Sequence, residues 1–308
     1  MDSFWITVLV MFVIVLIASY VKGMTRDRCL KDFDGYFCIF KFKNGDSVWG
    51  MLDVKSTGSV LRYKKPHDNI DHFETSFIVY RNEYPTLLGI FRPIEEMNKI
   101  ERMRREIQSA AVKVGFFSSI RKWFRKVFSV SRDAIVETLG TLTGKFYSKS
   151  SIISKNKKYV QEVEKGIVEF VGYSYDPILE EFIGKKVVYE IQIGDEWKEF
   201  VGVLRNYSKD FLEIFSTRFP VEVRFKIKET GQTEEFFKIR FSRTAGNLKI
   251  KNTRSSPVKV GDELIVEPGD EVMVTVPMEG EVEVRIVLFE EFDAIFPRSI
   301  ALIRHSAE

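Results

Sequence analysis

The chain is poor in the residues that most often build metal and catalytic centres. Its 308 residues include three histidines and two cysteines, too few for a strong metal-ligand set or a disulfide framework. Free thiols at Cys29 and Cys38 are typical of a reducing compartment, and a single disulfide between them in an oxidising compartment stays open. The sequence therefore predicts no metal, no cofactor and no disulfide-built fold.

Motifs for nucleophilic catalysis and nucleotide binding are also missing. The chain has no Gly-x-Ser-x-Gly elbow and no glycine-rich dinucleotide fingerprint. Residues 140–146 are similar to a phosphate-binding loop, but the segment is one residue short and has Phe146 where Ser or Thr must reach magnesium. We therefore expect no catalytic residues and no enzyme, unless a site exists that no motif announces.

Net charge is small, so it does not by itself indicate nucleic-acid binding. The formal charge is +3, and the chain is 44% hydrophobic and 30% charged, which is ordinary for a folded protein and excludes a disordered one. Phenylalanine is abundant at 27 copies, and with Val, Ile and Tyr it favours β-sheet. The expected fold class is mainly β.

One long apolar run opens the chain. Residues 4–21 carry no charge and no proline, and about 18 to 20 helical residues span roughly 30 Å of hydrocarbon. A cleaved signal needs a basic segment before the run, a shorter apolar core and a small-residue cleavage site. A buried core helix is seldom apolar on every face. We therefore predict a retained transmembrane helix within residues 1–23.

The orientation of this helix follows from the charges beside it. Basic residues come directly after the run, at Lys22, Arg26, Arg28 and Lys31. The positive-inside rule then places the N-terminus outside and the body of the protein in the cytoplasm. The predicted localisation is a single-pass membrane protein.

Residues 34–94 alternate in the manner of short strands. Tyr36, Cys38 and Phe40 share one face of the first strand. Residues 44–46 read Asn-Gly-Asp, a tight hairpin turn in which glycine supplies a positive φ. Further turns and apolar stretches complete about five short strands in this region.

The segment FKFKNGDSVWGMLDVKS within this region resembles the first motif of the Sm/LSm-like small β-barrels. That motif has a glycine in the turn, a second glycine five positions later, a leucine two beyond it and often an aspartate further on. The corresponding residues here are Gly45, Gly50, Leu52 and Ser56. The resemblance implies an Sm/SH3-like small barrel at residues 34–94. The family's RNA-reading Asp and Asn correspond to Ser56 and Val60, so the uridine-binding side chains are not reproduced.

A similar phrase returns within residues 165–219. Gly202 and Leu204 repeat the spacing of Gly50 and Leu52, again after an apolar strand and a Gly-Asp turn. Each copy has a tryptophan between the turn and the second glycine, Trp49 and Trp197, and the second hairpin carries three extra residues. We interpret residues 165–219 as a second barrel-like module. Two unrelated meanders with ordinary turns are the alternative.

Residues 95–146 are expected to form a basic amphipathic helical connector. Its first part is rich in arginine, and the candidate contacts for nucleic acid or anionic lipid are Arg102, Arg104 and Arg105. Its centre places aromatic residues on one helical face and basic residues on the other, which is typical of a helix lying on an anionic membrane. The predicted membrane-interface residues are Phe116, Phe117, Ile120, Arg121, Lys122, Trp123, Phe124, Arg125 and Lys126. There are two alternatives for this helix: it packs its aromatic face on a barrel, or it binds nucleic acid.

The rest of the chain is expected to comprise a linker and a further β module. Residues 147–164 begin with a polar, basic and turn-rich stretch, which favours a linker. Residues 220–308 return to a period of two, with turns at Gly261-Asp262 and Gly269-Asp270. Short strands at this spacing predict a C-terminal β-sandwich.

These features together predict a non-enzymatic, single-pass membrane-anchored scaffold or adaptor. Its expected partners are the lipid bilayer and either further copies of itself, as a homo-oligomer, or other proteins. Small barrels of the resembled family commonly form rings through edge-strand pairing, which the resemblance implies for this chain. A membrane-tethered RNA-binding protein and an accessory subunit of a channel are the alternative functions.

Overall fold

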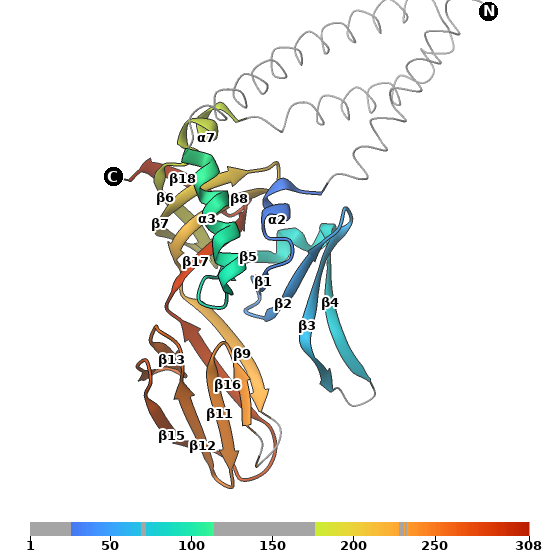
Figure 1. Ribbon diagram of the computed structural model, residues 1–308, viewed down its shortest axis with the longest axis vertical. Coiled ribbons are helices and arrows are strands. Elements are labelled where there is room, and N and C mark those ends of the chain that lie inside the picture. Colours follow the sequence, from blue (N-terminus) through green and yellow to red (C-terminus); the bar gives the residue numbers. More distant parts are fainter. Residues whose placement is uncertain (1–25, 69–71, 114–175, 228–230, 232, 308) are drawn as a thin grey trace, which may run out of the picture.

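The computed structural model describes residues 26–68, 72–113, 176–227, 231 and 233–307 (Figure 1). The predicted transmembrane helix at 1–23, the interfacial residues at 116–126 and the linker at 147–164 lie outside these ranges. Within them, no helix combines the length and the apolar character that a bilayer crossing requires.

The prediction of a mainly β fold is confirmed. The strands of the described residues pair antiparallel throughout and form one ten-stranded sheet and two four-stranded sheets. The ten-stranded sheet is built from two groups of five strands, which we call the first and second modules. The two smaller sheets lie at the other end of the molecule (Figure 1).

The first module occupies residues 28–93. A short helix precedes five strands, and a 3-10 helix lies between the fourth and the fifth. Its elements are α2 (Arg28–Asp32), β1 (Phe37–Phe42), β2 (Ser47–Val54), β3 (Gly58–Asp68), β4 (Phe73–Tyr80), η1 (Arg81–Thr86) and β5 (Leu87–Pro93). Their order in the sheet is β5-β1-β2-β3-β4. Alternate apolar residues of these strands, among them Cys38, Phe40 and Leu52, share one buried core with α2.

The second module has the same order of strands but is discontinuous in sequence. Its elements are α7 (Pro177–Phe182), β6 (Lys186–Ile193), β7 (Glu196–Tyr207), β8 (Phe211–Arg218), β17 (Glu291–Pro297) and β18 (Ala301–Ser306). The order in the sheet is β18-β6-β7-β8-β17. In each module the fifth strand therefore lies beside the first, and the fourth strand is outermost on the other side.

The local geometry of the two modules also corresponds. Asp27 and Asp176 cap α2 and α7 by accepting hydrogen bonds from backbone N–H groups. After each helix a glycine with positive φ donates its N–H to the second strand, Gly35 to Leu52 and Gly184 to Leu204. The leucine spacing seen in the sequence thus marks the same place in both modules.

The two tryptophans lie between the turn and the second glycine of their modules but do not occupy equivalent places. Trp49 precedes Gly50 and packs against the rings of Phe236 and Phe237 at centroid distances of 6.4 and 5.3 Å. Trp197 is 45% exposed and pairs across the β6–β7 hairpin with Gln192. The second hairpin is longer, so Trp197 lies near its tip instead of beside the second glycine.

The remaining strands form a unit that we call the insert, residues 221–288. One sheet has the order β10-β11-β12-β15 and the other β14-β13-β16-β9. Their bounds are β9 (Val221–Ile227), β10 (Thr233–Phe236), β11 (Ile239–Thr244), β12 (Asn247–Asn252), β13 (Val258–Val260), β14 (Leu264–Val266), β15 (Glu271–Thr275) and β16 (Val282–Leu288). The two sheets bury their inner faces against each other, as in the contact of Phe225 on β9 with Phe241 on β11.

The insert interrupts the second module between its third and fourth strands. The sequence prediction assigned all of 220–308 to one C-terminal module, but β17 and β18 belong to the ten-stranded sheet. Alternation identifies a strand without identifying its partner, which is why the boundary was misplaced. In the first module the same position is occupied by the long β3–β4 hairpin (Figure 1).

The connector begins with helix α3 (Lys99–Lys113), which follows β5 directly. The rest of the predicted connector lies outside the described residues. Helices α2 and α7 and the end of α3 lie toward the end of the molecule opposite the insert (Figure 1). The described chain begins before α2, breaks off after α3 and resumes before α7. All three of these places are therefore on one side of the body.

Gly50, which corresponds to Gly202 in the second module, provides a test of how closely strands β2 and β3 approach each other. A Cβ atom on Gly50 would lie 2.6 Å from the carbonyl oxygen of Arg62 on the next strand. Gly50→Ala is expected to lower the free energy of unfolding by about 1–3 kcal/mol, because the backbone of β3 must shift. Chemical denaturation of the purified protein measures this loss. The exposed Thr57→Ala in the neighbouring turn is the control, and equal stability of the two variants would contradict the close approach.

Candidate functional site

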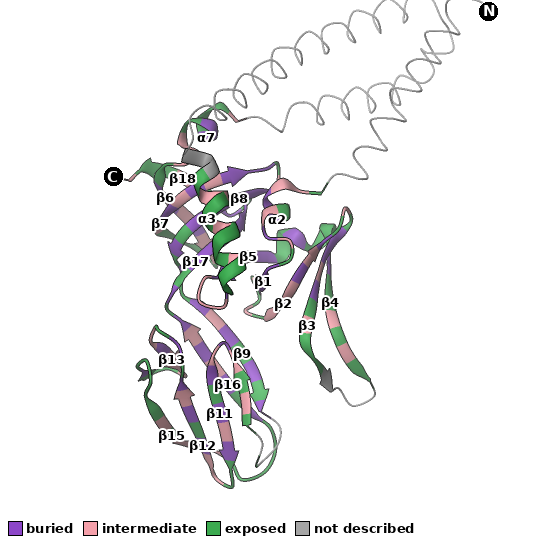
Figure 2. Cartoon of the chain, viewed as in Figure 1, coloured by how far each residue is buried: buried purple, intermediate pink, exposed green. Residues whose placement is uncertain are grey.

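The two modules join edge to edge. β5, the fifth strand of the first module, pairs antiparallel with β17, the fourth strand of the second, and the register places Arg92 opposite Asp293 and Ile90 opposite Ile295. All seven residues of β5 and six of the seven in β17 are buried (Figure 2). We call this pairing the junction.

A buried ion pair lies across the junction. The Nη2 atom of Arg92 donates to Oδ2 of Asp293 at 2.7 Å, and both side chains are fully buried. Arg105 on α3 donates to the same carboxylate at 2.6 and 2.8 Å, and the backbone N–H of Ser216 donates at 3.1 Å. Charge-assisted bonds from two arginines and one amide therefore compensate the desolvation of Asp293.

Aromatic rings surround the guanidinium of Arg92. Its centre lies 4.2 Å from the ring centroid of Phe33 and 4.4 Å from that of Tyr36, both next to α2. Phe215 on β8 lies 5.0 Å away. Arg92 thus ties together the helix of the first module, the junction and the second module.

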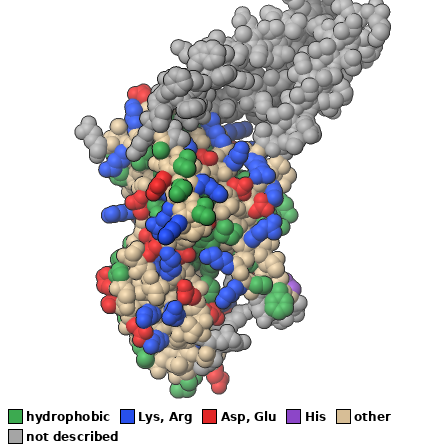
Figure 3. All heavy atoms as spheres, in the orientation of Figure 1, with side chains coloured by type: hydrophobic (Ala, Val, Ile, Leu, Met, Phe, Trp, Pro, Cys, Tyr) green, Lys and Arg blue, Asp and Glu red, His purple; other side chains and the backbone are tan. Residues whose placement is uncertain are grey.

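The three predicted arginine contacts lie on α3 but are not equivalent. The guanidinium of Arg105 donates a hydrogen bond to Asp293, and its side chain is mostly buried. Arg104 is exposed and lies 5.7 Å from the ring of Tyr36. Arg102 is exposed and bonds through Nε to the carbonyl of Met97 at 3.2 Å. In the view of Figure 3, Lys and Arg are interspersed with Asp and Glu over the described surface, without a uniform basic patch on that face.

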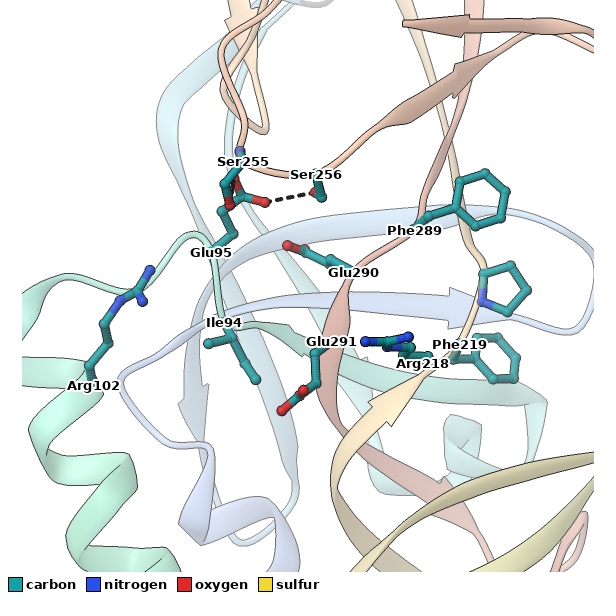
Figure 4. A pocket seen from close by; sticks show the side chains of 11 residues that line it. Ile94, Glu95, Arg102, Arg218, Phe219, Ser255, Ser256, Phe289, Glu290 and Glu291 are labelled. Atoms are coloured by element: carbon teal, nitrogen blue, oxygen red, sulfur yellow. Dashed lines mark hydrogen bonds between the residues drawn. The ribbon is translucent and has the colours of Figure 1, made fainter. Parts of the chain in front are cut away.

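A cleft of about 530 Å³ opens beside the junction, where the start of α3, the second module and the insert meet (Figure 4). Its lining is both charged and aromatic and includes Glu95, Arg102, Arg218, Phe219, Ser256 and Glu290. Glu95 accepts hydrogen bonds from Ser255 and from the hydroxyl of Ser256 at 2.9 Å. These hydrogen bonds connect the segment that follows β5 to the insert.

A second buried cation, Arg254 of the insert, lies behind this cleft. Its Nη2 atom is 2.6 Å from Glu290 and 3.0 Å from Glu95, and its Nη1 atom is 3.7 Å from Glu96. The Arg254 side chain is fully buried. One cation is therefore shared by three carboxylates, so it cannot neutralise all of them.

The shared cation shifts the protonation of the carboxylates around it. The pKa of Glu290 is raised to about 8, mainly by burial and also by the neighbouring Glu95, while Arg254 opposes both. The pKa of Glu95 is lowered: burial opposes this shift, but hydrogen bonds from Ser255 and the charge of Arg254 outweigh it. Glu290 is therefore expected to carry a proton near neutral pH while Glu95 is ionised.

Another buried carboxyl lies inside the second module. Glu213 on β8 is fully buried, and burial raises its pKa well above the usual range, with a further increase from Asp32. Among the described residues, no grouping of three or more His, Cys, Asp or Glu side chains is arranged to hold a metal ion. Cys29 and Cys38 are free and buried.

The outermost strands of the ten-stranded sheet are a second candidate site. β4 and β18 each have a single neighbouring strand among the described residues, β3 and β6 respectively. On β4 the side chains of Phe77, Ile78 and Tyr80 are 37%, 50% and 57% exposed. An unpaired strand that exposes apolar side chains can accept another strand along its edge. We refer to β4 and β18 as the open edges.

Comparisons with known proteins do not identify the chain: no protein-family model matches it, and neither the curated proteins nor the solved structures contain a match.

The residues of the junction and of the Arg254 cluster were not predicted from the sequence. A usable signal was present, because Arg92 and Asp293 each interrupt a strand that is otherwise almost entirely apolar, LLGIFRP and EFDAIFP. A charge in the interior of such a strand is buried with a partner far more often than alone. The partner of each residue could not be identified from sequence alone.

Asp293 provides a test of the junction. Asp293→Ala leaves the buried guanidinium of Arg92 without its carboxylate and is expected to cost about 3–5 kcal/mol of unfolding free energy. The matched control is Asp53→Ala, which removes a partly exposed carboxylate from its pair with Arg62 and is expected to cost less than about 1 kcal/mol. Denaturant unfolding measures both, and a loss at Asp293 no larger than that at Asp53 would disprove the role of the pair.

Glu290 provides a pH test. Its folded pKa of about 8 lies above its ordinary value, so the folded state holds more protons than the unfolded state between these two values. Stability is therefore present at low pH and is lost as pH rises toward 8, by at most about 1.4 kcal/mol per pH unit. Glu290→Gln cannot titrate and is expected to flatten the curve of unfolding free energy between about pH 5 and 8.

The control for this measurement is Glu279→Gln at an exposed position of the insert. It is expected to leave the slope of the wild-type curve unchanged. Parallel curves for wild type and Glu290→Gln would show that Glu290 is ionised throughout the range.

Proposed function

We propose that the protein is a non-enzymatic, single-pass membrane-anchored scaffold whose cytoplasmic body binds proteins through sheet edges. The observation that carries this proposal is the junction, where two five-stranded modules of one chain associate through the pairing of their edge strands. The same chain has two further strands, β4 and β18, whose outer edges are unpaired among the described residues. Edge pairing supplies affinity through backbone hydrogen bonds and needs no catalytic group.

The proposal includes the architecture inferred from the sequence. The five short antiparallel strands and apolar core of each module support an Sm/SH3-like small barrel. The facing four-stranded sheets of the insert support a β-sandwich. In this proposal the Arg-rich start of α3 has a structural role at the junction, because Arg105 binds Asp293.

Membrane attachment is supported by where the chain leaves the described body. The apolar residues 4–21 precede α2, and the basic aromatic segment 116–126 follows α3. The described chain begins before α2 and breaks off after α3 toward the end of the body opposite the insert (Figure 1). A helix through the bilayer and a helix on its surface would therefore hold the same side of the body against the membrane, and the second contact would be intramolecular.

Fractionation of cells that express the full chain tests this attachment. The protein is expected to remain in the membrane pellet after alkaline carbonate extraction, because a spanning helix is not released by charge or pH. A variant lacking residues 1–23 is expected to be released by the same treatment. Full-chain protein in the carbonate-soluble fraction would refute the anchor, whereas retention of both proteins would place the anchor elsewhere in the chain.

A further inference from the structure

We infer that helix α3 is a dimerisation surface, where the outer faces of the α3 helices from two copies of this chain pair side by side and in parallel. The inference goes beyond the proposed function, because this contact involves a helix and leaves the sheet edges free. The outer face of α3 carries Ile100, Met103 and Ile107, whose side chains are 72%, 64% and 64% exposed. Ala110, about one turn further along, is also exposed. We call these four residues the apolar stripe.

The rotation of α3 on the body is fixed by hydrogen bonds, so the apolar stripe cannot turn inward. Arg105 donates to Asp293 at 2.6 and 2.8 Å, and Nε2 of Gln108 donates to the backbone carbonyl of Asp32 at 3.2 Å. Gln108 in turn accepts a hydrogen bond from Arg92 at 3.4 Å. These contacts come from the side of the helix that faces away from the stripe. In the view of Figure 3, hydrophobic side chains are visible among charged ones over α3.

The apolar stripe has the spacing of a coiled-coil seam. Its members follow one another at intervals of three, four and three residues, which is the pattern of alternating a and d core positions in a heptad repeat. The two a positions are Ile100 and Ile107, and β-branched residues at this position favour parallel two-stranded pairs. In the sequence the spacing continues at Val114, directly after α3. A second helix with the same stripe is therefore the expected occupant.

The charges beside the stripe favour the parallel orientation. Residues that flank the a and d positions meet across the pair and help to set its orientation. An antiparallel pair with fully overlapping stripes would bring Arg104 beside Arg104 of the second copy and Glu106 beside its Glu106. A parallel pair separates both of these like charges. It places Lys99 near Arg104 of the second copy, but that guanidinium already lies 5.7 Å from the ring of Tyr36 on its own chain.

The course of α3 along the body favours a second copy over a lipid surface as the occupant. α3 begins beside the cleft at the insert, and its end lies toward the opposite end of the molecule (Figure 1). A helix that binds a bilayer surface lies in the plane of the interface. Under the proposed membrane attachment, on which this step rests, the stripe instead faces sideways toward a neighbouring copy. A two-fold axis along the membrane normal keeps both anchors on one side and makes the two helices parallel.

Cysteine cross-linking of the full chain in isolated membranes tests the pairing. In a parallel pair each stripe residue lies opposite itself, so Met103→Cys and Ile107→Cys are each expected to give a disulfide-linked dimer on oxidation with copper phenanthroline. The yield is expected to be severalfold above that of Arg102→Cys, at an exposed position of the same helix outside the stripe. The native Cys29 and Cys38 have no exposed surface and do not compete.

The same experiment distinguishes the two orientations. Ile100→Cys and Ala110→Cys are made with different tags and co-expressed. Residues ten apart on a helix are separated by about 15 Å along its axis, so a parallel pair is expected to give self-dimers of each variant and few mixed dimers. Mixed dimers in excess of self-dimers would mean an antiparallel pair and would overturn the inference. Yields no higher than that of Met273→Cys, at an exposed site of the insert, would mean random collision and would also overturn it.

A second substitution separates loss of pairing from loss of folding. Ile107→Asp, added to Met103→Cys, places a charge in the seam and is expected to lower the dimer yield severalfold. The matched control is Ile178→Asp, at an exposed apolar position of α7, which is expected to leave the yield unchanged. Both positions are exposed in a single copy, so thermal unfolding is expected to show that both variants are folded. Equal dimer yields from the two folded variants would reject the contact.

The remaining outcomes separate this contact from the bilayer and from the proposed anchor. A fluorophore on Met103→Cys that is quenched in vesicles of phosphatidylcholine with brominated acyl chains, in protein that gives no dimer, would assign the stripe to lipid. Membrane-bound protein that gives no dimer and no quenching would reject the inference and leave the anchored scaffold intact. Dimers in the carbonate-soluble fraction would support the pairing and reject the anchor alone.

Discussion

The arrangement of the protein depends on one requirement, that a strand buried on its faces must also have its edges paired. β5 is buried along its whole length in the assembled sheet, where an unpaired backbone N–H or C=O group would be costly. β17 satisfies these groups, and its own outer residues are equally buried. The first module is therefore incomplete without the second, and the ten strands are one sheet and not two neighbouring ones.

Two buried arginines specify how the parts meet around this sheet. Arg92 is compensated by Asp293, which also receives Arg105 and a backbone amide. Arg254 is surrounded by more carboxylates than it can neutralise, and burial leaves Glu290 with a raised pKa. Buried ion pairs add little net stability compared with apolar packing, but they penalise any arrangement that separates the partners. Their contribution here is to fix the position of α3 and of the insert relative to the junction.

The sequence revealed the local elements better than their associations. Alternating side chains and the turn at Gly45 correctly predict strands in the first module, and the Gly-x-Leu spacing at Gly202 locates the equivalent strand in the second. Alternation carries no information about which strand lies alongside, so β17 and β18 were assigned to the C-terminal module. Both tryptophans lie between a turn and a glycine in the sequence, but the longer second hairpin places Trp197 near its tip.

The candidate sites were harder to predict, because they depend on partners far apart in sequence. The arginines of α3 were identified as basic, yet the role of Arg105 is visible only beside Asp293. The open edges could not be recognised before the order of the strands was known. Residues 1–23 and 116–126 are a different case: their predicted roles rest on composition alone, and they lie outside the described residues.

The insertion of residues 221–288 between β8 and β17 also has a consequence for folding in the cell. Arg92 and Asp293 are 201 residues apart in the chain, and at usual elongation rates about 10–40 s of synthesis separate them. During this interval the first module and then the insert can fold through contacts that are local in sequence. The outer edge of β5 stays unpaired, because β17 has not yet been synthesised. That edge is therefore open to pairing with a wrong strand during this period.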